Sequence, residues 1–347
     1  MEFRDIALED KEWIDSLLHA SDYDSADYNF TVMFIWREII NTNVARYKDF
    51  LLVRFAEKKK YEKPFVQNGC GNCEKTENPI ALASNIKPAS DGDEADVRHA
   101  YYLFPAGNGN NDEELKEAID QIVADSEKLG AYVVFVGVLN KQVEFLQHYY
   151  PDKFDYMTYR NNFDYVYNAS DLITLKGKKY QSKRNFISRF KRSKNWLYEE
   201  ITEANIEDCS AMNTEWCKKY GCSHNPSLFA EGCSVKMAIK YYKELGLKGG
   251  LLRLDGKVVA FTLGEMTNSN TFLVHIEKAF ADVSGAYPTI NYEFLQHNAS
   301  LGFSFVNRED DTGDEGLRKS KTDYHPVKMI EKTIVTLKRH RLEIIPE

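Results

Sequence analysis

The stretch between residues 249 and 306 constrains the fold of this 347-residue chain more than any other. Two apolar segments, 249–254 and 257–265, flank Asp255-Gly256, a pair typical of the type I′ turn in a tight hairpin. A further turn leads into a third apolar segment, 271–276. The pattern predicts a three-stranded antiparallel meander.

A helix and a buried strand are expected to follow the meander. Pro288 suits the first position of a helix, and Ile290, Phe294 and Leu295 recur at helical spacing. The apolar run 303–306 comes after Gly302 and predicts a buried strand. Together these segments describe one mixed α/β unit.

The first half of the chain carries a weaker version of the same order of elements. We expect strands near 50–55, 79–83 and 99–104, a helix over 112–129, and a strand at 132–136. The similarity lies in the order of elements and not in the residues. We therefore expect an α/β (α+β) chain made of a tandem pair of units, divided as 1–168 and 169–347.

Composition narrows the class of protein. Hydrophobic residues make up 43% of the chain, enough for well-filled cores, and the formal net charge of -8 argues against a protein coated along its length by nucleic acid. The N-terminus lacks the basic start and apolar core of a signal peptide, and the longest apolar run, 131–139, is too short to span a bilayer. These features predict a cytoplasmic protein.

Cys70 and Cys73 have the C-x-x-C spacing of a zinc or redox site. A structural zinc site needs four ligands, and the other four cysteines supply no second C-x-x-C pair. The glycines and asparagines around the pair favour a turn over the helix start that a redox pair needs. Reduced structural cysteines are the favoured interpretation, and a metal or redox role is the alternative.

The segment 176–194 concentrates basic residues in an acidic chain. Its apolar positions recur at i, i+3 and i+4, which predicts an amphipathic helix with a basic outer face. Lys178, Lys183, Arg184 and Arg189 belong to that face. It could bind phosphates of RNA or of lipid head groups, and an ordinary solvated helix face is the alternative.

The segment 307–321 gathers both charge signs directly after the strand expected at 303–306. Asp310 and Asp311 leave the end of that strand, two glycines bend the chain, and Arg318 and Lys321 follow. Such a loop suits an anionic ligand or an amine. The alternative is a solvated loop whose charges pair with one another.

Both segments resemble motifs of the phosphatidylglycerol lysyltransferase C-terminal family, which shares a doubled GNAT-type acetyltransferase fold with FemX-type aminoacyltransferases. The resemblance rests on 177–190 and on the order Asn307, Asp311, Gly313, Gly316-Leu317-Arg318, Lys321 and Pro326. It implies a tandem pair of GNAT-like acyltransferase units with mixed central sheets. It also implies transfer of an aminoacyl group from aminoacyl-tRNA to an amine or hydroxyl acceptor.

Two departures from the family bear on its substrates. The membrane-spanning half of the lysyltransferases is absent from this sequence, which weighs against a lipid acceptor and leaves a small molecule or a peptide as alternatives. The usual pyrophosphate signature of acyl-CoA enzymes is missing before Pro288, where 281–286 stands instead. We therefore expect no cofactor and no metal, with an acyl-CoA-dependent N-acyltransferase as one alternative and a non-catalytic RNA- or anion-binding module as another.

Aminoacyl transfer assigns roles to residues of the second unit. Arg318 and Lys321 would hold a phosphate or the tetrahedral oxyanion, and Asp310 or Asp311 would orient the donor ammonium or accept a proton. Glu277 is an alternative base, and Asn291 could bind substrate. His275 is expected to face the core or a neighbour in the sheet. Contacts to the tRNA acceptor arm would come from Lys178, Lys183, Arg184 and Arg189. The first unit lacks the motif and is expected to have a structural or acceptor-positioning role.

Overall fold

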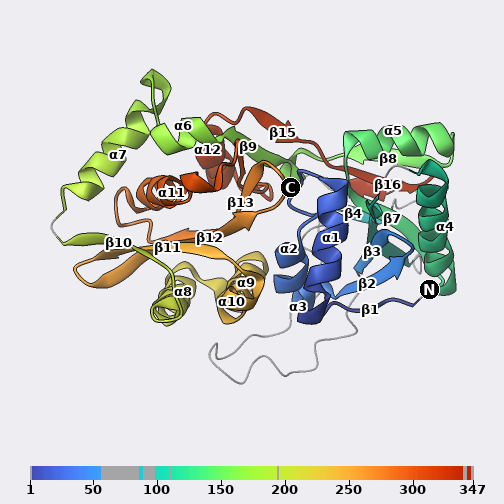
Figure 1. Ribbon diagram of the computed structural model, residues 1–347, viewed down its shortest axis with the longest axis horizontal. Coiled ribbons are helices and arrows are strands. Elements are labelled where there is room, and N and C mark those ends of the chain that lie inside the picture. Colours follow the sequence, from blue (N-terminus) through green and yellow to red (C-terminus); the bar gives the residue numbers. More distant parts are fainter. Residues whose placement is uncertain are drawn as a thin grey trace.

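The computed structural model describes residues 2–55, 86–88, 98–108, 111–193, 195–338 and 342–344. Within them the chain forms two mixed α/β units, which lie side by side along the longest axis of the molecule (Figure 1). The strand expected at 79–83 and the Cys70–Cys73 pair fall outside the described residues.

The first unit is built on a mixed sheet in the order β1-β2-β3-β5-β7-β16-β8, with β6 pairing with β3. β5 and β7 are parallel, and the other neighbours along this order are antiparallel. The strands are β1 (Arg4–Asp5), β2 (Thr42–Tyr47), β3 (Phe50–Phe55), β5 (His99–Leu103), β6 (Ala106–Gly107), β7 (Tyr132–Val138), β8 (Phe154–Thr158) and β16 (Thr333–Leu337).

The second unit repeats this plan in the order β10-β11-β12-β13-β14-β9-β15. In both sheets the parallel pair joins the fourth and fifth strands, here β13 and β14. The strands are β9 (Asp164–Asn168), β10 (Trp196–Glu200), β11 (Lys248–Leu254), β12 (Lys257–Met266), β13 (Thr271–Ala279), β14 (Phe305–Asn307) and β15 (Lys328–Ile330). A short pair, β4 (Ile86–Pro88) with β17 (Leu342–Ile344), lies apart from both sheets.

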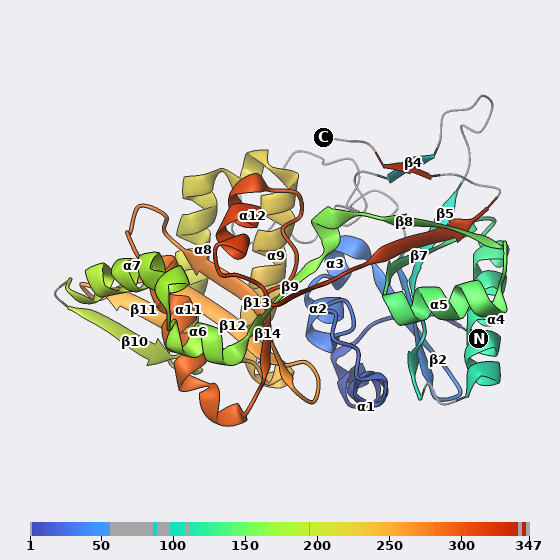
Figure 2. The ribbon, with the colours of Figure 1, turned by 90° about the horizontal axis from the view of Figure 1, so that it is seen from above.

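The two units exchange their sixth strands. β9 follows the first unit in sequence but lies in the second sheet, and β16 comes from the C-terminal part of the chain but lies in the first. Figure 2 shows the chain crossing between the units along β9 and along β15–β16. The division at residue 168 stays a prediction. Because of this exchange, no single boundary in the sequence separates the strands of the two sheets completely.

Helices cover both faces of each sheet and share one continuous core between the units. Residues of α1, α2, α8 and α9 belong to a single buried cluster, in which Phe34 meets Tyr241 edge-on at 5.1 Å. Apolar residues of α4 and α5 cover the other face of the first sheet, and those of α6, α7 and α11 cover that of the second. The helices are α1 (Lys11–Ser21), α2 (Phe30–Ile35), α3 (Arg37–Ile40), α4 (Asp112–Lys128), α5 (Asn140–Tyr149), α6 (Ala169–Thr174), α7 (Gln181–Lys191), α8 (Ile206–Tyr220), α9 (Pro226–Lys240), α10 (Tyr242–Leu245), α11 (Ala286–His297) and α12 (Glu315–Thr322).

Two local predictions near the site were wrong in detail. α11 begins at Ala286, so Pro288 is its third residue, where the amide that proline lacks would still have no partner within the helix. The segment 307–321 is not one loop, because its second half forms α12. Asp314 caps that helix by accepting a hydrogen bond from the Leu317 amide at 2.6 Å.

The expected meander is confirmed as β11, β12 and β13, with Asp255 and Gly256 both at positive φ in the first turn. Within the described residues, no helix is both long and apolar enough to cross a membrane.

Candidate functional site

The segment Asn307–Asp311 lies where the two units meet and sends its side chains to different places. Glu309 has a left-handed backbone with φ of 55°, which turns the chain sharply after β14. Arg308 contacts the second unit, whereas Asp310 lines a pocket of the first. We call this segment the crossover loop.

The Asn307 end of the crossover loop is fixed by a buried polar cluster. Asp164 is fully buried and accepts hydrogen bonds from the Asn307 amide group at 3.1 Å and the Ala26 backbone at 2.8 Å. Lys332 pairs with Asp164 at 2.7 Å and with Asp27 at 3.1 Å. Although burial opposes it, these carboxylates raise the pKa of Lys332. The cluster joins both units through charge-assisted contacts.

Asp311 and Arg318 form an ion pair that shapes the far end of the crossover loop. Arg318 donates to both carboxylate oxygens of Asp311 at 2.9 Å, and Tyr165 donates to the same group. Burial alone would raise the pKa of Asp311, but the Arg318 and Tyr165 hydrogen bonds hold it below its ordinary value. Arg318 also donates to Asn161 at 2.6 Å. Most of its hydrogen-bonding capacity is therefore used within the protein.

Lys321 is buried beneath the crossover loop. Its ammonium donates to the carbonyl oxygen of Arg308 at 2.6 Å and to that of Asp310. These contacts tie α12 to the loop backbone. Both basic residues expected to hold an anion, Arg318 and Lys321, thus support the loop in this structure.

Glu309 belongs to a carboxylate–imidazole–carboxylate row around the buried ring of His275. The ring of His275 lies 3.0 Å from Glu265 and 3.4 Å from Glu309. Burial would lower the pKa of His275, but the two carboxylates raise it to about 9, so the ring is an imidazolium at neutral pH. The expectation that His275 faces the core or a neighbour in the sheet is confirmed, since Glu265 lies on the neighbouring strand β12.

Arg308 spans a gap between β13 and β14. β14 pairs with residues 271–273, so the later part of β13 extends past the end of its parallel neighbour. Arg308 pairs there with Glu277 at 2.9 Å, and Asn291 of α11 donates to the other oxygen of Glu277 at 2.8 Å. The Arg308 side chain is 8% exposed, and its Nη1 has no hydrogen-bond partner in the described part of the chain.

Lys183 turns inward from α7 towards this ion pair. Its ammonium lies 4.1 Å from the centre of the Tyr324 ring, which the Arg308 guanidinium approaches at 4.9 Å. Burial lowers the pKa of Lys183, and nearby Arg308 adds to that effect. Two cations therefore converge on one aromatic ring beside the open end of β13. Lys183, Glu277 and Asn291, which the sequence suggested separately, are brought together here.

Asp310 lies at the charged end of a cavity in the first unit, which we call the apolar pocket. Its walls come from α2, α3 and the adjoining face of the first sheet, and Asp27, Asn162, Asp310 and Lys332 form its polar end. Burial raises the pKa of Asp310 to about 7. The apolar residues that line it are Val32, Met33, Ile40, Phe55, Tyr101, Leu103, Val136 and Ile334.

Gly137 makes room for the second carboxylate of this pocket. It has φ of 65°, and a Cβ there would lie 2.5 Å from a carboxylate oxygen of Asp27. Any side chain at this position would therefore displace Asp27 from the backbone of β7. Burial also raises the pKa of Asp27, against the opposing effect of Lys332.

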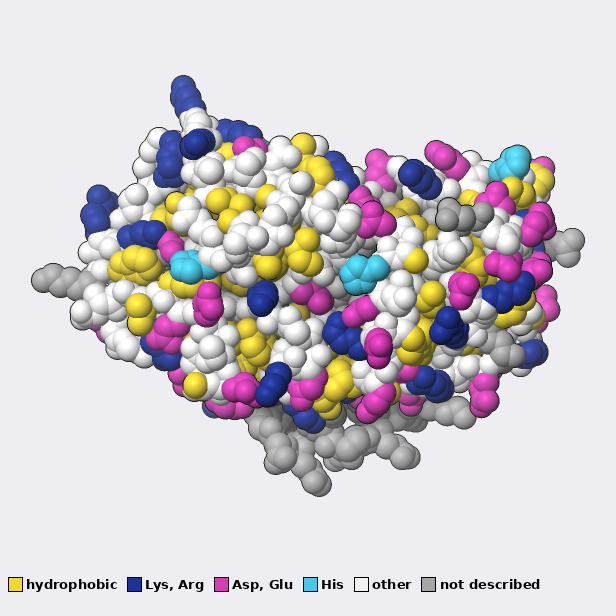
Figure 3. All heavy atoms as spheres, viewed as in Figure 1, with side chains coloured by type: hydrophobic (Ala, Val, Ile, Leu, Met, Phe, Trp, Pro, Cys, Tyr) yellow, Lys and Arg dark blue, Asp and Glu magenta, His cyan; other side chains and the backbone are white. Residues whose placement is uncertain are grey.

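The expected basic helix is confirmed as α7, but it is shorter than 176–194, and Lys178 lies in a 3-10 turn before it. The basic residues of this segment divide into two groups. Arg184 donates to the carbonyl oxygens of Leu175 and Gly177, and thereby supports the chain between α6 and α7. Lys178 and Arg189 are exposed. Figure 3 shows Lys and Arg side chains gathered at the end of the molecule that α6 and α7 form.

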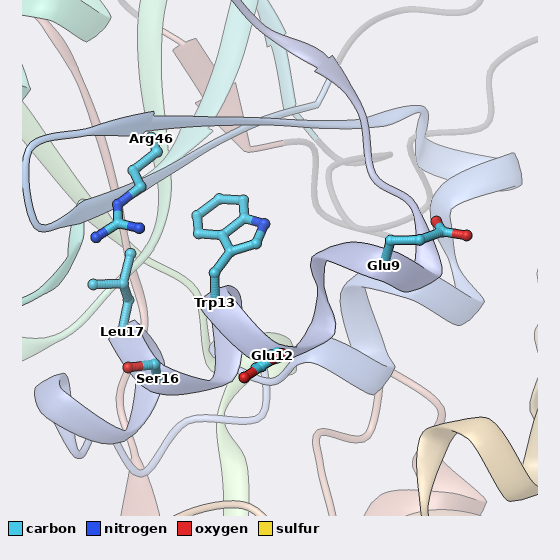
Figure 4. A pocket seen from close by; sticks show the side chains of 6 residues that line it. All are labelled: Glu9, Glu12, Trp13, Ser16, Leu17 and Arg46. Carbon is cyan, nitrogen blue, oxygen red and sulfur yellow. The ribbon is translucent and has the colours of Figure 1, made fainter.

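A second hollow lies on the outer side of the first unit. Figure 4 shows Trp13 and Leu17 of α1 beneath Arg46 of β2, with Glu9 pointing away. Its polar groups have local partners, since Trp13 donates to Asp10 at 2.8 Å and Arg46 lies 3.4 Å from Asp49. We assign this hollow no role in the chemistry.

Sequence reasoning missed the buried charged residues that lie beside the crossover loop. Asp27, Asp164 and Lys332 are far apart in the chain and belong to no common motif, yet Lys332 pairs with both carboxylates. Asp27 and Lys332 also line the apolar pocket together with Asp310. The available signals were Gly137 within an apolar strand and Lys332 beside the apolar segment 333–337.

Comparison with solved structures places this fold among known proteins. A conserved protein of unknown function from Bacteroides thetaiotaomicron is 33% identical, with a TM-score of 0.81, over 97% of this chain and 100% of that one. The C-terminal domain of a putative lysylphosphatidylglycerol synthetase from Agrobacterium fabrum is 14% identical, with a TM-score of 0.60, over 94% of this chain and 91% of that domain. FemX is 11% identical, with a TM-score of 0.56, over 96% and 97%.

These likenesses confirm the predicted tandem GNAT-like fold. A comparison with curated protein sequences gave no match. The model of the family described as phosphatidylglycerol lysyltransferase, C-terminal, matches residues 94–336, which include the crossover loop and the basic helix. The chain therefore belongs to the phosphatidylglycerol lysyltransferase C-terminal family.

Proposed function

We propose that this chain transfers an aminoacyl group from aminoacyl-tRNA to an amine or hydroxyl acceptor, with the crossover loop at the centre of the site. Membership of the lysyltransferase C-terminal family and a fold shared with FemX support this reaction class. Since a fold alone does not determine function, the residues must supply the chemistry.

One observation carries the proposal: Asp310 places a carboxyl group with a pKa of about 7 in a largely apolar pocket of the first unit. A general base works best when its pKa lies near the working pH. Asp310 would accept the proton that the acceptor loses as it attacks the donor ester. Asp311, Arg318 and Lys321 would act as positioning residues, because they hold the loop that carries Asp310.

The donor would approach from the second unit. Exposed Lys178 and Arg189 would contact phosphates of the acceptor arm. Lys183 would meet the terminal phosphate beside the open end of β13, together with Nη1 of Arg308, which has no hydrogen-bond partner among the described residues. Glu277 and Asn291 would hold Arg308 in place rather than transfer protons, since each is engaged in the buried ion-pair cluster.

A coenzyme A donor fits this arrangement less well. The pyrophosphate would need the backbone amides at the start of α11, but α7 packs closely there. A Cβ on Gly285 would lie 2.5 Å from the carbonyl oxygen of Phe186. A carbonyl oxygen therefore lies beside the start of α11, where the pyrophosphate would need open space and free amides. We therefore propose that the reaction uses no acyl-CoA.

The test is release of labelled amino acids from a mixed aminoacyl-tRNA pool, in the presence of a cell extract that contains small molecules and lipids. Wild type should discharge one or a few aminoacyl-tRNAs, and Asp310→Asn should slow this at least about 100-fold. Asp255→Asn is the matched control, because asparagine suits the positive φ of the exposed hairpin turn.

Equal discharge by wild type and Asp310→Asn would refute the assignment of Asp310. No discharge by any variant, together with tight tRNA binding, would favour a non-catalytic RNA-binding module. Stabilisation by coenzyme A in a thermal shift, without tRNA binding, would favour an acyl-CoA-dependent enzyme.

A further inference from the structure

We propose that the apolar pocket is the acceptor site and that its occupant is a primary amine carried on an apolar body. This inference rests on the proposed function, since it names the acceptor of the same transfer. The shape of the pocket, its charge and its place relative to the crossover loop each contribute to the argument.

The walls of the pocket favour an apolar body. Leu103, Val136 and Ile334 line it from the sheet, and Val32 and Met33 face them from α2. None of these five side chains can donate or accept a strong hydrogen bond, so a polar group between them would lose its bonds to water. An aliphatic or aromatic body would instead gain from leaving water.

The charge at the polar end favours a cation. Three carboxylates, Asp27, Asp164 and Asp310, surround the ammonium of Lys332. Lys332 is only 5% exposed and is already paired with two of them, so it is poorly placed to receive an anion. The Asp310 side chain has no ion-pair partner within 4.0 Å in the described residues, although its Oδ1 accepts a hydrogen bond from the Thr312 amide. An ammonium would complete this end, whereas the phosphate of an anionic phospholipid would be repelled.

The crossover loop separates this acceptor site from the donor side. Arg308 lies at the open end of β13 in the second unit, and Asp310, two residues later, lines the pocket in the first. A donor ester approaching over Arg308 and an amine held at Asp310 would reach the loop from opposite units. The turn at Glu309, with φ of 55°, directs the two side chains to these different places.

The reaction balances with the groups present. The ammonium of the acceptor gives one proton to Asp310, and the free amine attacks the ester carbonyl of aminoacyl-tRNA. A carbon–nitrogen bond forms, the carbon–oxygen bond to the ribose breaks, and the second proton of the nitrogen passes to the ribose oxygen. The products are an amide and a tRNA with a free hydroxyl, and Asp310 later releases its proton to water.

Binding of three eight-carbon probes to the wild-type protein without tRNA tests the site independently of activity. Octylamine and octanol share an octyl body, octanoate has a body one methylene shorter, and the three probes differ in charge. Calorimetric titration should give octylamine at least tenfold tighter binding than octanol, with octanoate weakest. Asp310→Asn should reduce the preference for octylamine, whereas Asp255→Asn should keep it. Equal or tighter binding of octanol or octanoate would overturn the proposal.

Transfer then tests the acceptor class. The aminoacyl-tRNA that wild type discharges is offered octylamine, octanol or vesicles of phosphatidylglycerol, and the product is treated with mild alkali. We expect an alkali-stable amide of octylamine. An alkali-labile ester of phosphatidylglycerol or octanol as the main product would overturn the amine acceptor. Selective octylamine binding without transfer to any acceptor would count against the proposed aminoacyl transfer and in favour of an amine pocket.

Discussion

Replacing Lys321 by methionine should destabilise the protein through the crossover loop. Methionine keeps a long apolar stem but removes the ammonium that donates to the carbonyl oxygens of Arg308 and Asp310. Each buried carbonyl left without a partner costs about 1–3 kcal/mol. Removing a buried ammonium recovers part of that cost, because the charge no longer needs to leave water. We therefore expect a net loss of about 2–4 kcal/mol in the free energy of unfolding.

The assay is urea unfolding at pH 7, followed by circular dichroism and by tryptophan fluorescence. Lys319→Met is the matched control, because Lys319 is exposed on the same helix, and it should change the stability by less than about 0.5 kcal/mol. If Lys321→Met unfolds at the same urea concentration as Lys319→Met, the two carbonyl contacts do not support the loop, and the reasoning is wrong.

Three further predictions follow from the site. The carboxylates around His275 raise its pKa from 6.5 to about 9. The stabilisation that the charged ring gives the folded protein is therefore fully present below pH 6.5 and is lost as the pH rises through 9. Between pH 6.5 and pH 9.5, the free energy of unfolding of wild type should fall by about 3 kcal/mol more than that of His275→Gln. An equal fall in both proteins would contradict the positive charge assigned to His275. Arg189→Ala should weaken tRNA binding several-fold and reduce the slope of log affinity against log salt concentration by about one. Arg184→Ala should mainly lower thermal stability, because Arg184 supports the chain before α7. Weaker tRNA binding by Arg184→Ala than by Arg189→Ala would refute the division of the basic residues into two groups. Glu277→Gln should lower the stability of the protein, because Glu277 pairs with buried Arg308. It should leave the pH dependence of transfer in place, and loss of that dependence would indicate that Glu277 is the base.

The sequence predicted the elements that depend on local patterns. The hairpin at Asp255-Gly256 and the meander around it follow from turn chemistry and alternation, which act over a few residues. α4 and β7 follow from helical spacing and from an unbroken apolar run. α12 was missed because a short, highly charged helix has little apolar periodicity, and its signal was the cap at Asp314.

The site itself depends on contacts between distant parts of the chain. Nothing local indicates that β9 and β16 change sheets, yet that exchange brings Asp164 and Lys332 together beside Asp27. The motif pointed to the crossover loop, but it could not separate Asp310, which lines a pocket, from Asp311, which is held by Arg318. That difference arises from the fold around two adjacent residues of identical chemistry.

The most direct test of the account is the pH dependence of single-turnover transfer from the aminoacyl-tRNA that the protein discharges. A base must be ionised to accept a proton, and burial raises the pKa of Asp310 to about 7. The rate for wild type should therefore rise as the pH increases through 7 and then level off, while the slow residual rate of Asp310→Asn should not level off near pH 7. The same levelling near pH 7 in both proteins would contradict the claim that Asp310 is the base of an aminoacyl transfer.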